Sequence, residues 1–118
     1  NIVIDKKPSP EVYYRTLKDL KLPANKCIAI EDTANGNVSA IKAGLRTIIT
    51  THAYTMDNNF NGASLVLNNL GEPNNEFHVD KNFHCKKSYV DVELLNTIII
   101  NEKDFLLKQK YQKMGERV

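Results

Sequence analysis

Two adjacent carboxylates stand at the point where a short apolar run ends. Glu31 and Asp32 directly follow residues 27–30, which read Cys-Ile-Ala-Ile. In open α/β sheets, ligands bind beyond the carboxyl ends of the strands, and carboxylate oxygens are ligands that suit Mg²⁺. The pair therefore predicts a magnesium site with Glu31 and Asp32 as the metal ligands. The alternative is that Asp32 or Thr33 only caps the helix that follows.

A close turn is predicted directly after this acidic pair. Asn35 and Gly36 come next in the chain, before a run with helical character. Because glycine has no Cβ, it allows the backbone to turn closely into the following helix. We interpret Asn35 and Gly36 as the structural turn of the site.

A lysine stands directly before a predicted helix start. Lys7 precedes Pro8, Ser9 and Pro10, with Ser9 as the predicted N-cap and Pro10 as the first helical residue. A lysine charge and the free N–H groups of a helix N-terminus both favour a bound phosphate. The alternative is a solvated lysine ahead of an ordinary helix cap, and the local sequence alone favours that alternative.

Helices and strands alternate along the first two thirds of the chain, joined by short connections. This order is typical of a doubly wound α/β layer with parallel strands and right-handed crossovers. The continuous apolar run at 27–30 further predicts a strand that is buried on both faces. The predicted elements are a helix at 9–21, a strand at 27–30, a helix at 35–43, a strand at 47–50 and a strand at 65–67.

The composition changes after Gly71, which divides the chain into three predicted regions. Residues 1–71 are expected to form one half of a Rossmann-like core, and residues 72–88 a polar connector or insertion. Residues 89–118 are expected to form a C-terminal helix with a charged tail. Its predicted apolar side carries Val92, Leu95, Ile99 and Leu106.

Composition and charge exclude several classes of protein. A formal net charge of +2 on 118 residues is too small to favour nucleic acid or an anionic membrane surface as a partner. No apolar run approaches the roughly 18 residues that a membrane span needs. Cys27 lies in an apolar run and Cys85 has no zinc-like spacing to a second pair, so we expect reduced thiols in the cytoplasm or another reducing compartment. The chain begins with Asn1, so we expect a fragment of a longer protein; its oligomeric state is left open.

The two clusters, taken together in this order, resemble the haloacid dehalogenase superfamily. The resemblance is strongest to the branch that holds β-phosphoglucomutase and the CbbY-like sugar-phosphate phosphatases. It covers roughly residues 5–72. The matching segments are Lys7-Pro8-Ser9-Pro10-Glu11-Val12-Tyr13, then Cys27 to Asp32, Asn35-Gly36, Ala43-Gly44-Leu45 and Thr47 to Thr50.

The resemblance implies a role for each matching residue. Lys7 would contact the transferring phosphoryl group, and Asp32 would hold the cofactor Mg²⁺. Glu31 would be its partner in metal binding or in ordering metal-bound water. In this family an aspartate attacks the phosphate and forms an aspartyl-phosphate, and a second aspartate acts as general acid and base. The resemblance therefore implies a phosphatase or phosphosugar mutase, with a phosphorylated small molecule, such as a sugar phosphate, as its partner.

The sequence also departs from the family pattern. It contains no Asp-x-Asp-Gly-Thr motif, no Ser/Thr phosphate-binding motif before Lys7 and no cap domain. We therefore expect the nucleophile to lie upstream and these residues to be inactive by themselves. Two other interpretations stay open. One is a non-catalytic binding or scaffold module of the same fold, and the other is an unrelated α/β domain in which Lys7 and Asp32 lie far apart.

Overall fold

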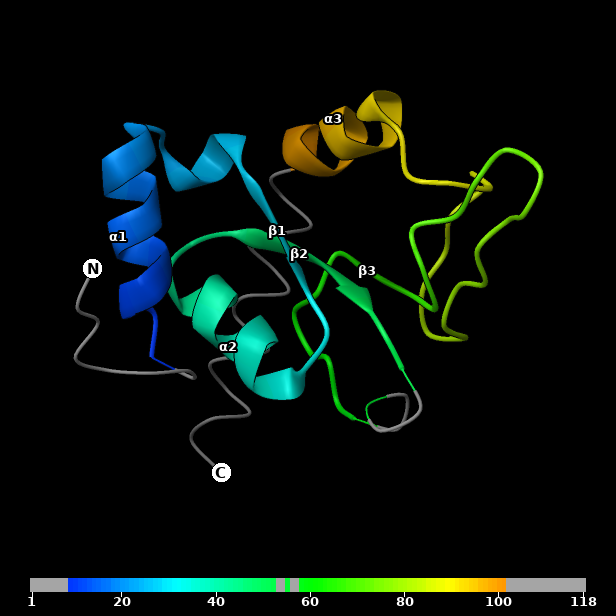
Figure 1. Ribbon diagram of the computed structural model, residues 1–118, viewed down its shortest axis with the longest axis horizontal. Helices are drawn as coiled ribbons and strands as arrows, with labels where there is room; N and C mark the ends of the chain where they lie inside the picture. The colour runs from blue at the N-terminus through cyan, green and yellow to red at the C-terminus, as the bar shows by residue number, and fades with distance from the viewer. Residues whose placement is uncertain (1–8, 53–54, 56–57, 102–118) are drawn as a thin grey trace.

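The described residues fold into a three-stranded sheet flanked by helices (Figure 1). The structure is a computed structural model that describes residues 9–52, 55 and 58–101. Lys7 and the predicted helical residue Leu106 lie outside the described residues. Within the described ranges, no helix has the length and apolar character that a membrane crossing requires.

All the strand pairs of the sheet are parallel. Strands β1 (Ile28–Glu31), β2 (Arg46–Thr50) and β3 (Leu65–Leu67) lie side by side in that order. Ile28 pairs with Arg46, and Ile48 pairs with Leu65. The predicted α/β fold with three parallel neighbouring strands is therefore confirmed, and each strand lies within one residue of its predicted bounds.

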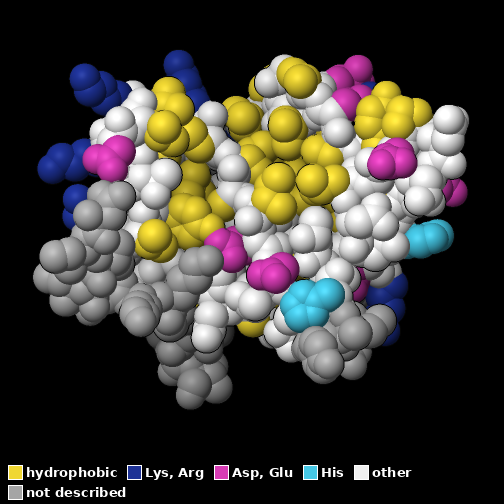
Figure 2. Space-filling view, in the orientation of Figure 1, with side chains coloured by type: hydrophobic (Ala, Val, Ile, Leu, Met, Phe, Trp, Pro, Cys, Tyr) yellow, Lys and Arg dark blue, Asp and Glu magenta, His cyan; other side chains and the backbone are white. Residues whose placement is uncertain are grey.

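Strand β1 is not buried on both faces, so that prediction was wrong. The side chain of Ile30 is 50% exposed, whereas Ile48 and Ile49 of β2 are fully buried. Strand β1 is the end strand of the three, and within the described residues no further strand pairs with its outer side. Figure 2 shows hydrophobic side chains uncovered between α1 and α3, on the face that it presents. A continuous apolar run cannot distinguish an end strand from a central one, because exposure depends on the neighbours.

Helix α1 (Glu11–Leu20) begins two residues later than the predicted helix at 9–21. Pro10 occupies the cap position, and the hydroxyl of Ser9 still accepts a hydrogen bond from the N–H of Glu11 at 3.3 Å. Because proline has no N–H, Pro10 needs no partner there. Tyr13 and Leu17 pack against the core, whereas Leu20 at the end of the helix is exposed.

Helix α2 (Ala34–Lys42) packs between α1 and the sheet. Ala40 and Ala43 form one core cluster with Ala29 of β1 and Leu45. The helix ends at Lys42 with Ala43 as its C-cap, and Gly44 follows with a φ of 88°, a left-handed conformation that favours glycine. A short 3-10 helix, η1 (Ala24–Lys26), joins the end of α1 to β1.

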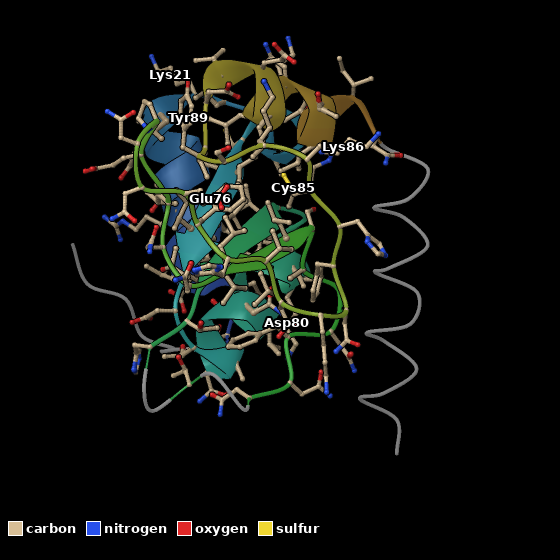
Figure 3. The ribbon with its side chains drawn as sticks, turned by 90° about the vertical axis from the view of Figure 1, so that its right-hand side faces the viewer. Lys21, Glu76, Asp80, Cys85, Lys86 and Tyr89 are labelled. Carbon is tan, nitrogen blue, oxygen red and sulfur yellow. The ribbon has the colours of Figure 1, made fainter. Side chains whose placement is uncertain are left out.

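The other side of the sheet is covered by α3 (Val92–Ile100) and by part of the segment before it. Phe77 is buried against Ile48 and Leu65. The N–H of Asn68 donates to the carbonyl of His78 at 3.1 Å, so this stretch runs beside β3. Figure 3 shows the same segment with its side chains Glu76, Asp80 and Cys85.

The side of α3 that faces the core agrees with the prediction only in part, because Leu95 packs there as predicted but Val92 does not. Leu94 is 8% exposed and packs with Leu95 and Ile98, whereas Val92 is 71% exposed. Asp91 caps the helix, since its carboxylate accepts a hydrogen bond from the N–H of Leu94 at 2.8 Å. This cap fixes the start of the helix, so Val92 becomes its first residue and lies outside the core.

Leu94 and Val92 provide a direct check of this arrangement. Changing Leu94 to Ala leaves a cavity in the core, and we expect a loss of about 2–5 kcal/mol in the free energy of unfolding. The matched change of Val92 to Ala removes an exposed side chain and should alter stability by no more than about 0.5 kcal/mol. Urea denaturation of both variants measures the difference. If Val92→Ala lost more stability than Leu94→Ala, then Val92 and not Leu94 would face the core.

Candidate functional site

Side chains from two neighbouring strands meet at the carboxyl edge of the sheet. Glu31 ends β1 and pairs with Ile49 of β2, so Asp32 and the residues after Thr50 leave the sheet at the same edge. The Nε2 atom of His52 lies 3.7 Å from an Oδ atom of Asp32. Figure 2 shows acidic side chains and a histidine gathered close together on this face.

Asp32 does not cap the following helix. The cap is Thr33, whose hydroxyl oxygen accepts a hydrogen bond from the N–H of Gly36 at 3.0 Å. The side chain of Asp32 is 58% exposed and points toward His52 from the end of β1. Its carboxylate is therefore accessible to a ligand in solution, which a helix-capping carboxylate would not be to the same extent.

Glu31 lies in a very different environment from its neighbour. It is 7% exposed, and its carboxylate accepts a hydrogen bond from the hydroxyl of Tyr13 on α1. The other carboxylate oxygen lies against Gly36, so closely that a Cβ built at Gly36 would collide with it. Successive strand residues point to opposite faces, which explains why Glu31 is enclosed by the helices while Asp32 is open.

The predicted turn at Asn35 and Gly36 is in fact part of α2. Both residues lie in the first turn of the helix, and Gly36 does not have a positive φ. Asn35 is exposed. The glycine is required because it leaves space for the Glu31 carboxylate, and not because the backbone turns there.

Hydrogen bonds made by buried polar side chains hold α2 in place beside the site. Thr47 of β2 donates its hydroxyl to the side-chain oxygen of Asn37 at 2.6 Å, and the Asn37 amide donates to the carbonyl of Asn61 at 2.9 Å. The hydroxyl of Ser39 donates to the carbonyl of Ser9 at 2.5 Å. These bonds join the helix to β2, to the loop before β3 and to the residues just before α1.

The donor atoms at this edge suit a hard cation. Within the described ranges, no three His, Cys, Asp or Glu side chains gather closely enough to hold a metal ion by themselves. Mg²⁺ does not require such a cluster, because it usually binds one or two carboxylates and completes its shell with water and phosphate oxygens. The open carboxylate of Asp32, with Glu31 buried beside it, fits that pattern.

Sequence reasoning missed two residues at this edge. His52 follows the end of β2 by two residues, so the argument that singled out Asp32 after β1 applies to it as well. Tyr13 stood in the sequence only as the last residue of the matching segment that begins at Lys7, although its hydroxyl reaches Glu31. A buried carboxylate signals that a hydrogen-bond donor must be near, but the sequence does not show which residue supplies it.

Gly36 and Asn35 test how tightly Glu31 is enclosed. Changing Gly36 to Ala forces the Glu31 carboxylate to move, and overpacking of this kind costs about 1–3 kcal/mol of stability. The control, Asn35→Ala, alters an exposed residue of the same helical turn and should change stability by no more than about 0.5 kcal/mol. Thermal or urea unfolding compares them. A Gly36→Ala protein as stable as the wild type would show that the space beside Glu31 is not needed.

The sequence of this chain is similar to that of known proteins. The family model for haloacid dehalogenase-like hydrolases matches residues 2–50. The CbbY protein of Cupriavidus necator is 46% identical over 68 residues, which are 58% of this chain and 27% of that protein. A CBBY-like protein of Arabidopsis thaliana is 36% identical over 76 residues, which are 64% of this chain and 24% of that protein. The chain thus spans only about a quarter of the length of these relatives.

Two solved structures of similar proteins also superpose on part of this chain. A mutant CbbY from Rhodobacter sphaeroides, in complex with xylulose 1,5-bisphosphate, superposes with a TM-score of 0.56 and 40% identity. That match covers 57% of this chain and 30% of the CbbY chain. A HAD hydrolase of Entamoeba histolytica gives a TM-score of 0.58 at 25% identity, over 86% of this chain and 39% of that one. The resemblance predicted from the two sequence motifs is confirmed: over part of its length, this chain matches the haloacid dehalogenase-like hydrolases, within their CbbY branch.

Proposed function

We propose that these residues belong to a Mg²⁺-dependent phosphohydrolase or phosphosugar mutase that acts on a phosphate ester. One observation carries the proposal. Asp32 leaves the carboxyl edge of a parallel sheet with its carboxylate open, because Thr33 and not Asp32 caps the next helix. The relationship to the CbbY proteins supports the same chemistry. The nucleophilic aspartate of the proposed aspartyl-phosphate lies outside these 118 residues.

Asp32 is the proposed ligand of the metal ion, and Glu31 is its proposed partner. The enclosed Glu31 suits the ordering of metal-bound water, since its carboxylate is held from two sides. When bound, Mg²⁺ would supply positive charge to a phosphate oxygen. Asp32 would fix where that charge lies, because it extends from the end of a strand within a packed sheet.

Lys7 is the proposed contact of the phosphoryl group. It precedes Ser9 by two residues, and the Ser9 carbonyl is bonded to Ser39 of α2. Helix α2 also carries Gly36, which lies against Glu31. The chain after Lys7 is therefore attached to the helix that follows the acidic pair. This attachment supports the proposal that Lys7 and Asp32 contribute to one site.

A phosphorylated sugar is the proposed substrate class. The CbbY structure that superposes on this chain is a complex with xylulose 1,5-bisphosphate, a sugar that carries two phosphates. Cys27 and Cys85 are free thiols, and we propose that the protein works in the cytoplasm or another reducing compartment.

Replacing Asp32 with Asn tests the metal-binding role. The change keeps the size of the side chain but removes its charge, and losing a metal ligand raises the barrier by several kcal/mol. We therefore expect phosphate-ester hydrolysis by the full-length protein to fall about a hundredfold or more, since each 1.36 kcal/mol is about tenfold in rate. The readout is kcat/KM for phosphate release as a function of Mg²⁺ concentration.

The matched control is Asp19→Asn, an exposed carboxylate on α1 away from the sheet edge. It should leave turnover unchanged, and circular dichroism should show that both variants are folded. Near-normal turnover by a folded Asp32→Asn protein would reject the catalytic assignment. A wild-type full-length protein with no Mg²⁺-dependent turnover would instead favour a non-catalytic binding module.

A further inference from the structure

The hydroxyl of Tyr13 joins helix α1 to the acidic pair. Tyr13 lies in the first turns of α1, and its hydroxyl donates a hydrogen bond to the carboxylate of Glu31 at the end of β1. The ring of Tyr13 packs with Leu17 against the cluster formed by α2 and β1. Tyr13 therefore has two functions that can be separated: its ring contributes to packing, and its hydroxyl contacts a buried carboxylate.

Glu31 is held from both sides of its carboxylate. One oxygen accepts from Tyr13, and the other lies against the bare Cα of Gly36. A glutamate side chain has three rotatable bonds, so its carboxylate is well placed only where neighbours restrict it. Gly36 limits the carboxylate by shape alone, whereas Tyr13 fixes it by a directional bond. Without the hydroxyl, one of these two restraints is lost.

We propose that Tyr13 is a positioning residue for the metal site and not only a packing residue. Its hydroxyl fixes the carboxylate of Glu31, the residue that directly precedes Asp32, so that Glu31 can serve as a ligand or as an acceptor for metal-bound water. Hydrogen-bond partners of metal-binding groups commonly alter metal affinity about 10–100-fold when they are removed. This inference rests on the proposed function, because it needs a cation at Asp32.

The neighbouring tyrosine provides a matched control. Tyr14 is also on α1, but its hydroxyl donates to the carbonyl of Lys42 at 3.1 Å, at the opposite end of α2 from Gly36. Tyr13→Phe and Tyr14→Phe each keep the aromatic ring but remove one hydroxyl, together with the hydrogen bond that this hydroxyl donates from α1. Only the first bond leads to the acidic pair.

The experiment is a titration of the full-length protein with Mn²⁺, followed by electron paramagnetic resonance of the free ion and by competition with Mg²⁺. Tyr13→Phe should weaken Mn²⁺ and Mg²⁺ binding by about tenfold or more, and Tyr14→Phe should not change it. Urea unfolding of both variants checks that they are folded. Tyr13→Phe protein that binds both cations as tightly as the wild type overturns the inference.

A double-mutant cycle separates positioning from general disturbance. If Tyr13 acts through Glu31, adding Tyr13→Phe to Glu31→Gln should give little further loss of cation affinity. Independent, additive losses from the two changes would overturn the inference while leaving Asp32 as a ligand. A wild-type protein that binds no Mn²⁺ would overturn both this inference and the proposed function, so the two failures are distinguishable.

Discussion

Residues Ile28 to Glu31 pair in parallel with Arg46 to Ile49, and the features at the sheet edge depend on this register. It sends the ends of β1 and β2 to the same edge, so Asp32 and His52 come within 3.7 Å although they are separated in the sequence. The buried side chains of β2 secure the register on both faces, because Ile48 packs toward α3 and Ile49 toward the loop before β3. A slip by one residue would exchange these faces.

The alternation of side chains along the chain at the end of β1 then places the two carboxylates in different surroundings. Glu31 points to the face covered by α1 and α2, where Tyr13 and Gly36 enclose it. Asp32 follows on the other side, where its side chain is exposed among the described residues. The hydrogen bonds from Asn37 and Ser39 fix α2 to its neighbours, which keeps Gly36 beside Glu31. The site is thus supported by a packed layer and is open to solvent at Asp32 and His52.

The sequence was sufficient to predict the parallel strands, because short apolar runs alternating with helical segments leave few arrangements. It also placed Asp32 at the end of a strand. It did not predict that Ile30 is exposed or that Val92 faces solvent, since both depend on neighbours and on one cap residue, Asp91. The partner of Glu31 was equally hidden, because the contact with Tyr13 joins two elements across 18 residues of sequence. Patterns predict elements well, whereas contacts between elements require the packed structure.

The claim that a cation binds beside Asp32 is tested most directly by nuclear magnetic resonance of the full-length protein during addition of Mn²⁺. This ion occupies oxygen-rich magnesium sites, and its unpaired electrons broaden the signals of nearby nuclei. We predict that the amide signals of residues 31–33 and 50–52 broaden first and recover when excess Mg²⁺ is added. Broadening centred on the exposed charges of α3, near Asp91 and Glu93, or spread evenly over the surface, would contradict the account.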